Sequence, residues 1–131
     1  MNNCCCAEGV KLIYACSGCS DVGEISDRVV RVLSKEGFGK MKCLAAVGAH
    51  LSGPVKSAMG ADENIAIDGC SDACARKNLE HIGVTPKSYV LTEMGLEKGK
   101  TILTDEMVDE VSKKIRDKIL FECGREDDGN K

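Results

Sequence analysis

Apolar residues follow two different periods along this chain, and the two periods alternate. Four short, almost continuous apolar runs are typical of strands buried on both faces of a sheet. These predicted strands cover residues 10–15, 41–47, 65–67 and 89–91. Four longer stretches repeat their apolar residues at helical spacing. These predicted helices cover residues 21–37, 52–60 and 71–82, and a last one from 104 onward.

Local signals mark the ends of the first and last predicted helices. Asp21 and Glu24 have the spacing of a capping box, and Gly37 is a natural C-terminal stop. Thr104 is suited to cap the last helix. The apolar stripe of that helix consists of Val108, Val111, Ile115 and Ile119. Both helices should therefore turn one apolar side toward a core.

Strand and helix alternate four times, and this alternation predicts the fold. It favours an α/β protein with a four-stranded parallel sheet covered on both faces. Right-handed crossovers leave few topologies, of which the flavodoxin-like strand order 2-1-3-4 is favoured. We therefore expect a three-layer, Rossmann-like sandwich in a single domain.

Length and composition fit this picture and narrow the function. A chain of 131 residues suits one domain, predicted over 10–121, with a flexible Cys-rich tail at 1–9 and a flexible acidic tail at 122–131. A net charge of −3 and 3% aromatic residues disfavour nucleic-acid binding. The sequence contains neither an apolar run of about 18 residues nor a basic leader, which disfavours a membrane partner and predicts a cytoplasmic location.

Nine cysteines are the unusual feature of the composition. An odd number of thiols without an export signal indicates a reducing compartment, where clustered cysteines serve metal or redox chemistry. Cys16 and Cys19 follow the first predicted strand, and Cys70 and Cys74 follow the third. In the order 2-1-3-4 these two loops are neighbours at the carboxyl edge of the sheet, where open parallel sheets bind ligands.

Two closely spaced cysteine pairs suit one tetrahedral metal ion. Four thiolates form a closed Zn²⁺ site, which leaves no position for a substrate and favours a structural or metal-handling role over catalysis. The same donors also suit an iron–sulfur cluster, and residue types leave that choice open. The helix predicted to follow each pair should favour the thiolate state.

Other cysteines and histidines are weaker candidates. Cys43 is predicted to be a buried strand residue about 13 Å from the site, and only an earlier strand end would make it an additional ligand. His50 is expected on the same sheet edge as the thiols and is a possible further ligand, whereas His81 is expected at the opposite edge. The segment 94–99 is interpreted as a solvated loop rather than a lid. Roles for the remaining cysteines do not follow from the sequence: Cys4, Cys5, Cys6 and Cys123.

Two enzymatic alternatives stand beside the metal site. Cys16 and Cys19 have the spacing of a thiol-redox or sulfur-transfer pair. Cys70 and Arg76 have the C-x5-R spacing of cysteine-dependent phosphatases and arsenate reductases, although Asp72 would repel a phosphate. The sequence leaves enzymatic activity undecided and favours a binding protein, with a metal ion as its partner and no protein partner indicated.

The cysteine motifs resemble those of the DGC-domain family, small prokaryotic proteins named for an Asp-Gly-Cys motif. The matching segments are ACSGCSD at 15–21, MKCL at 41–44, DGC at 68–70 and CAR at 74–76. The resemblance covers about residues 10–121. It implies a zinc site built from four cysteines, without an assigned reaction, and it leaves open which four of the five candidate thiols bind.

Overall fold

The computed structural model describes the backbone of residues 9–128 and the side chains of residues 9–123. Cys4, Cys5 and Cys6, together with nearly all of the predicted N-terminal tail, lie outside the described residues. The predicted acidic tail is described in part, as the end of the last helix.

The sheet has four parallel strands in the order β2-β1-β3-β4, which confirms the predicted fold and strand order. The strands are β1 (Lys11–Ala15), β2 (Lys40–Met41), β3 (Glu63–Asp68) and β4 (Lys87–Val90). In the register of the two central strands, Ala15 pairs with Ile67. The loops that follow β1 and β3 therefore leave the sheet side by side at its carboxyl edge.

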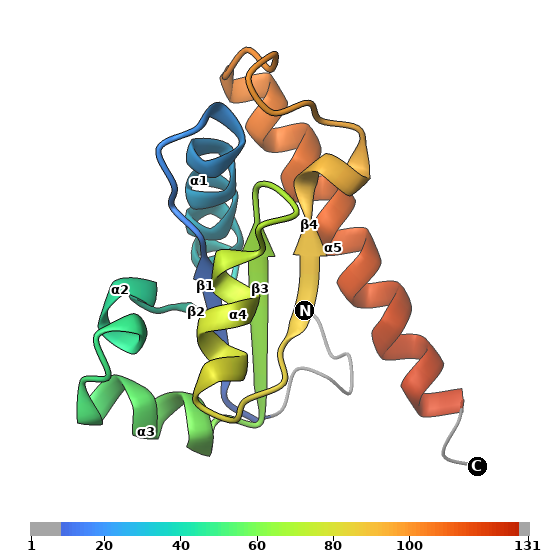
Figure 1. Cartoon of the computed structure of the whole chain (residues 1–131). Helices are drawn as coiled ribbons and strands as arrows, with labels where there is room; N and C mark the ends of the chain where they lie inside the picture. Colours follow the sequence, from blue (N-terminus) through green and yellow to red (C-terminus); the bar gives the residue numbers. More distant parts are fainter. Residues whose placement is uncertain (1–8, 129–131) are drawn as a thin grey trace.

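Helices cover both faces of the sheet (Figure 1). The α-helices are α1 (Asp21–Lys35), α2 (Leu44–Gly48), α3 (Ser52–Gly60), α4 (Cys74–His81) and α5 (Asp105–Asp128), and a 3-10 turn, η2, spans Leu91–Met94. One core packs α1 and α5 against one face, and it includes the whole predicted stripe of α5. A second core packs α2, α3 and α4 against the other face.

Alternation along β1 separates the two cores. Ile13 and Ala15 face α1 and α5, whereas Leu12 and Tyr14 belong to the second core, because successive strand residues point to opposite faces. All four are buried. No helix within the described residues is both long and apolar enough to cross a lipid bilayer.

The second predicted strand is wrong over most of its length. β2 ends at Met41, and Leu44–Gly48 form α2 instead of continuing the strand. A short apolar run does not distinguish a strand from a helix by periodicity, and Ala45 and Ala46 favour the helix. Cys43 is consequently the exposed N-cap residue of α2 rather than a buried strand residue.

The N-cap of α1 differs from the predicted position by one residue, and the start of α4 differs by three. The N-cap of α1 is Ser20, whose hydroxyl accepts a hydrogen bond from the Gly23 amide at 3.1 Å. Asp21 is the first residue of the helix, and its carboxylate accepts hydrogen bonds from the Gly99 and Thr101 amides. α4 begins at Cys74 rather than near residue 71, because a turn closed by the Ala73 amide on the Cys70 carbonyl comes first.

Gly69 allows the loop after β3 to touch the first turn of α1. A Cβ at this position would lie 2.6 Å from the carbonyl carbon of Val22 and 2.8 Å from the amide nitrogen of Gly23. Both obstacles are backbone atoms of a helix, which yield only if the helix moves. The glycine of the Asp-Gly-Cys segment is therefore required by packing.

We expect Gly69→Ala to lower the free energy of unfolding by about 1–3 kcal/mol, because an added methyl overpacks the contact with α1. The matched control is Gly60→Ala at the end of α3, where a Cβ meets nothing within 4 Å. That control should change stability by less than about 0.5 kcal/mol, because the position is exposed. Urea denaturation of both variants measures the difference, and equal stability of the two would contradict the packing argument.

Candidate metal centre

The loops that carry the two cysteine pairs touch directly. The Gly69 amide donates a hydrogen bond to Cys16 Sγ at 3.4 Å, and the Cys16 amide donates to the Ile67 carbonyl at 3.2 Å. Cys16 Sγ also lies 3.2 Å from Ser26 Oγ. The half-buried Cys16 thiol is thus held between the loop after β3 and the first turns of α1.

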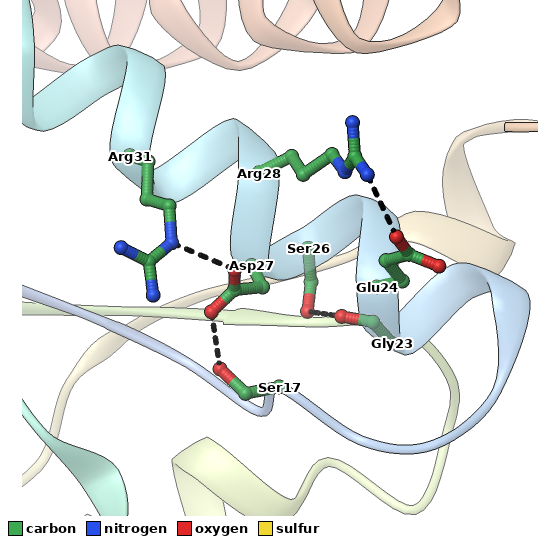
Figure 2. Close-up of polar contacts among 7 residues, drawn as sticks. All are labelled: Ser17, Gly23, Glu24, Ser26, Asp27, Arg28 and Arg31. Atoms are coloured by element: carbon green, nitrogen blue, oxygen red, sulfur yellow. Dashed lines mark hydrogen bonds and ion pairs between the residues drawn. The ribbon is translucent and has the colours of Figure 1, made fainter. Parts of the chain in front are cut away.

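The loop between Cys16 and Cys19 is held in an uncommon backbone conformation by α1. Ser17 is left-handed, with φ 50°, and its hydroxyl donates to Asp27 Oδ1 at 2.8 Å. Arg31 Nε in turn donates to the other oxygen of Asp27 at 2.8 Å, and Figure 2 shows this chain of contacts. These bonds keep the pKa of Asp27 low despite its partial burial. The turn that separates the two cysteines is therefore fixed by a carboxylate on the neighbouring helix.

Asp68, which precedes Gly69, secures the start of α4. Its buried carboxylate accepts hydrogen bonds from the Ala75 amide at 2.7 Å and the Arg76 amide at 3.2 Å. Burial is the largest influence on this group and raises its pKa, while the two amide bonds oppose that shift. The aspartate of the Asp-Gly-Cys segment thus caps a helix that begins six residues later.

The Cys74 thiol lies among negative or potentially negative groups. Its pKa is raised by burial and then by the nearby charges of Asp68, Cys16, Asp72 and Cys70. The prediction that a helix N-terminus would favour the Cys74 thiolate is therefore wrong. A cluster of like charges opposes ionisation, and a bound cation would relieve that repulsion.

The segment after η2 lies beside the site. Most of residues 94–99 are exposed, as in the predicted solvated loop, but the segment is also bonded to the start of α1. The Asp21 carboxylate accepts the Gly99 amide at 2.8 Å and the Thr101 amide at 2.9 Å, and these two bonds lower its pKa most. Lys98, the residue before Gly99, places its ammonium 3.5 Å from Cys70 Sγ. In Figure 1 this segment curves past the start of α1 at the carboxyl edge of the sheet.

The donor chemistry of this edge fits a thiophilic metal, although the thiols are not arranged as a finished chelate. Cys16 and Cys70 are half-buried, and Cys19 and Cys74 are exposed. Among the side chains of residues 9–123, no three Cys, His, Asp or Glu residues converge closely enough to hold an ion. The four thiols follow β1 and β3 at the same edge of the sheet, and binding them all to one ion requires the loops to rearrange.

The two additional candidates do not lie where we expected them. β2 ends at Met41, so Cys43 lies beyond the strand. It is the exposed residue that caps the start of α2. His50 lies against His81, with ring centroids 5.5 Å apart. Since His81 ends α4 and Cys74 begins it, about 10 Å separates the two ends, and His50 belongs to the end far from the thiols.

Sequence reasoning missed three charged residues that organise the site: Asp68, Asp21 and Lys98. Asp68 had no clear signal, because Ser71 and Asp72 are themselves typical cap residues and only the structure shows that α4 begins without a side-chain cap from Ala73. Asp21 was interpreted as the cap of α1. Its bonds reach residues 78 and 80 positions away, which no local pattern reveals.

Comparison with known proteins places these motifs in a family. A family model described as the DGC domain matches residues 12–115. The anaerobic and virulence modulator AnvM of Pseudomonas aeruginosa is 34% identical over 88 residues, which cover 66% of this chain and 67% of that protein. No solved structure matches the chain.

We expect Asp68→Ala to destabilise the protein by about 1–3 kcal/mol, because two α4 amides lose their acceptor. Asp68→Asn should cost less, since it keeps one acceptor oxygen and removes the charge that burial disfavours. The exposed Asp109→Asn on α5 is the control. Urea denaturation reports stability, and amide exchange at Ala75 and Arg76 should accelerate in Asp68→Ala; unchanged exchange would refute the capping role.

Proposed function

Because this chain belongs to the DGC-domain family, we propose that it is a metal-binding protein that holds one Zn²⁺ through Cys16, Cys19, Cys70 and Cys74. The supporting observation is the contact between the Gly69 amide and Cys16 Sγ, which joins the loops carrying the two cysteine pairs. Residues 50 or more positions apart in the chain are thereby brought to one edge of the sheet.

The metal ion first binds the two half-buried thiols, and the two exposed thiols then complete its coordination. Cys16 and Cys70 are half-buried and hydrogen-bonded, so they form the floor of the site. Cys19 and Cys74 are exposed and swing inward to complete it. Left-handed Ser17 and Ala73 lie beside this closing movement, and such backbone strain often marks switch points.

A bound zinc ion would hold all four sulfurs as thiolates and tie the two loops together. Four thiolates fill the tetrahedral coordination of zinc and leave no open position for a substrate. The proposed role is therefore metal handling or structural support rather than hydrolysis. A relative described as an anaerobic and virulence modulator accords with a regulatory use of such a site.

The phosphatase-like alternative is disfavoured by the hydrogen bonds of α4. A phosphate loop needs free backbone amides at the helix start to hold the anion. Here the Ala75 and Arg76 amides are already bonded to Asp68, and the Arg76 guanidinium lies 3.8 Å from Glu80. A thiol-redox or sulfur-transfer role for Cys16 and Cys19 is the remaining alternative, and the experiment below distinguishes it.

We expect the purified, reduced protein to bind one equivalent of zinc, and Cys16→Ser and Cys74→Ser each to lose most of it. The control is Cys43→Ser, which removes an exposed thiol at the start of α2 and should keep the metal. Metal content by mass spectrometry, with an absorption spectrum to identify iron–sulfur clusters, is the measurement.

Full zinc occupancy in either ligand variant would contradict a shared site. Alkylation followed by peptide mapping then tests the redox alternative on the zinc-loaded protein. The zinc site predicts that Cys16 and Cys19 react more slowly than Cys43 until a chelator is added. Faster reaction of Cys16 or Cys19 without a chelator would favour the enzyme.

A further inference from the structure

Residues 96–101, here called the strap, are fixed at three points. Leu96 is buried in the core between α1 and α5. The Gly99 and Thr101 amides both donate to the Asp21 carboxylate at the start of α1. Within the strap, the Thr101 hydroxyl donates to the Glu97 carbonyl at 2.6 Å and closes the turn. The strap is therefore bound to the same helix that packs against Cys16.

The strap carries Lys98 to the thiol cluster. Lys98 Nζ lies 3.5 Å from Cys70 Sγ and 3.8 Å from Asp72 Oδ2. Both contacts place the ammonium beside the loop that follows β3. Because the next residue, Gly99, is bonded to Asp21, the backbone that carries this lysine is tied to the start of α1.

A cation at this point matters most when the four thiols are ionised. Four thiolates around one divalent ion carry a formal net charge of about −2. A hydrogen bond from an ammonium to a ligand sulfur reduces that excess, and charge-assisted bonds are stronger than neutral ones. Groups that bond to metal ligands typically change metal affinity by about 10–100-fold.

We propose that Lys98 is a positioning residue of the thiol cluster: held in place by Asp21 through the strap, it bonds to Cys70 and slows the escape of the metal. The effect of Lys98 on metal release depends on the proposed metal site. The contact between Lys98 and Cys70 exists independently of the metal, so the two proposals can be tested apart.

The first experiment measures transfer of zinc from the full-length protein to a chromogenic chelator. Lys98→Gln should release zinc about tenfold faster than the wild type. Lys100→Gln is the matched control, because it removes the same charge from the strap, yet Lys100 is 78% exposed and pairs only weakly with Glu97. Equal release rates for Lys98→Gln and Lys100→Gln would overturn the proposal.

Asp21→Asn tests whether the strap positions the lysine. Removing a negative charge near a thiolate cluster should by itself strengthen metal binding. If the strap is freed, however, Asp21→Asn should also release zinc faster. The double variant with Lys98→Gln should then be no faster than Lys98→Gln alone, since coupled residues are not additive. Slower release in Asp21→Asn, or additive effects, would overturn the role of Asp21.

A second experiment uses metal-free protein and compares two alkylating reagents. Because both reagents attack the same thiolate, the ratio of their rates does not depend on how far the thiol is ionised. The ratio of alkylation rates of Cys70 by iodoacetate and iodoacetamide reports the local charge that the reagents meet. Lys98→Gln should lower this ratio by about fivefold, and Lys100→Gln should leave it near the wild-type value. An unchanged ratio would refute the Lys98 contact. If the ratio falls but the wild type binds no zinc, the metal function fails while the contact stands.

Discussion

The backbone contact between Gly69 and the first turn of α1 is the constraint on which this site depends. Only a residue without a Cβ lets the loop after β3 approach Val22 so closely. That approach allows the Gly69 amide to bond to Cys16, and it leaves Asp68 buried beneath the start of α4. The positions of three cysteines therefore follow from one tight contact between two neighbouring β–α connections.

Local patterns in the sequence predicted the fold because period and alternation are local properties. The strands β1, β3 and β4 and the long helices followed from them, whereas the order 2-1-3-4 followed from the handedness of crossovers and a preferred topology. The prediction failed at β2, where the alanines of 44–48 make a helix from an apolar run that also suits a strand. It also placed His50 on the wrong end of the molecule, because nothing local indicates its contact with His81.

The candidate site was predictable as a gathering of thiols but not as an electrostatic arrangement. Cysteines after β1 and β3 must share an edge in a parallel sheet with neighbouring strands. Asp68, Asp21 and Lys98 act through bonds to residues 7 to 80 positions away. Such bonds depend on the finished packing, so the raised pKa of Cys74 and the position of Lys98 had no signal in residue spacing.

The bonds of Asp21 join the start of α1 to a segment that is synthesised about eighty residues later. The first cysteine pair and Asp21 leave the ribosome early, the second pair follows about fifty residues later, and the strap comes last. A partly made chain can present Cys16 and Cys19, but it lacks the opposing loop and the lysine above it. All four thiols are present once residue 74 has been added, whereas the strap that carries Lys98 is complete only after residue 101. A metal ion that binds before residue 70 has been made would therefore find only Cys16 and Cys19 of the four proposed ligands.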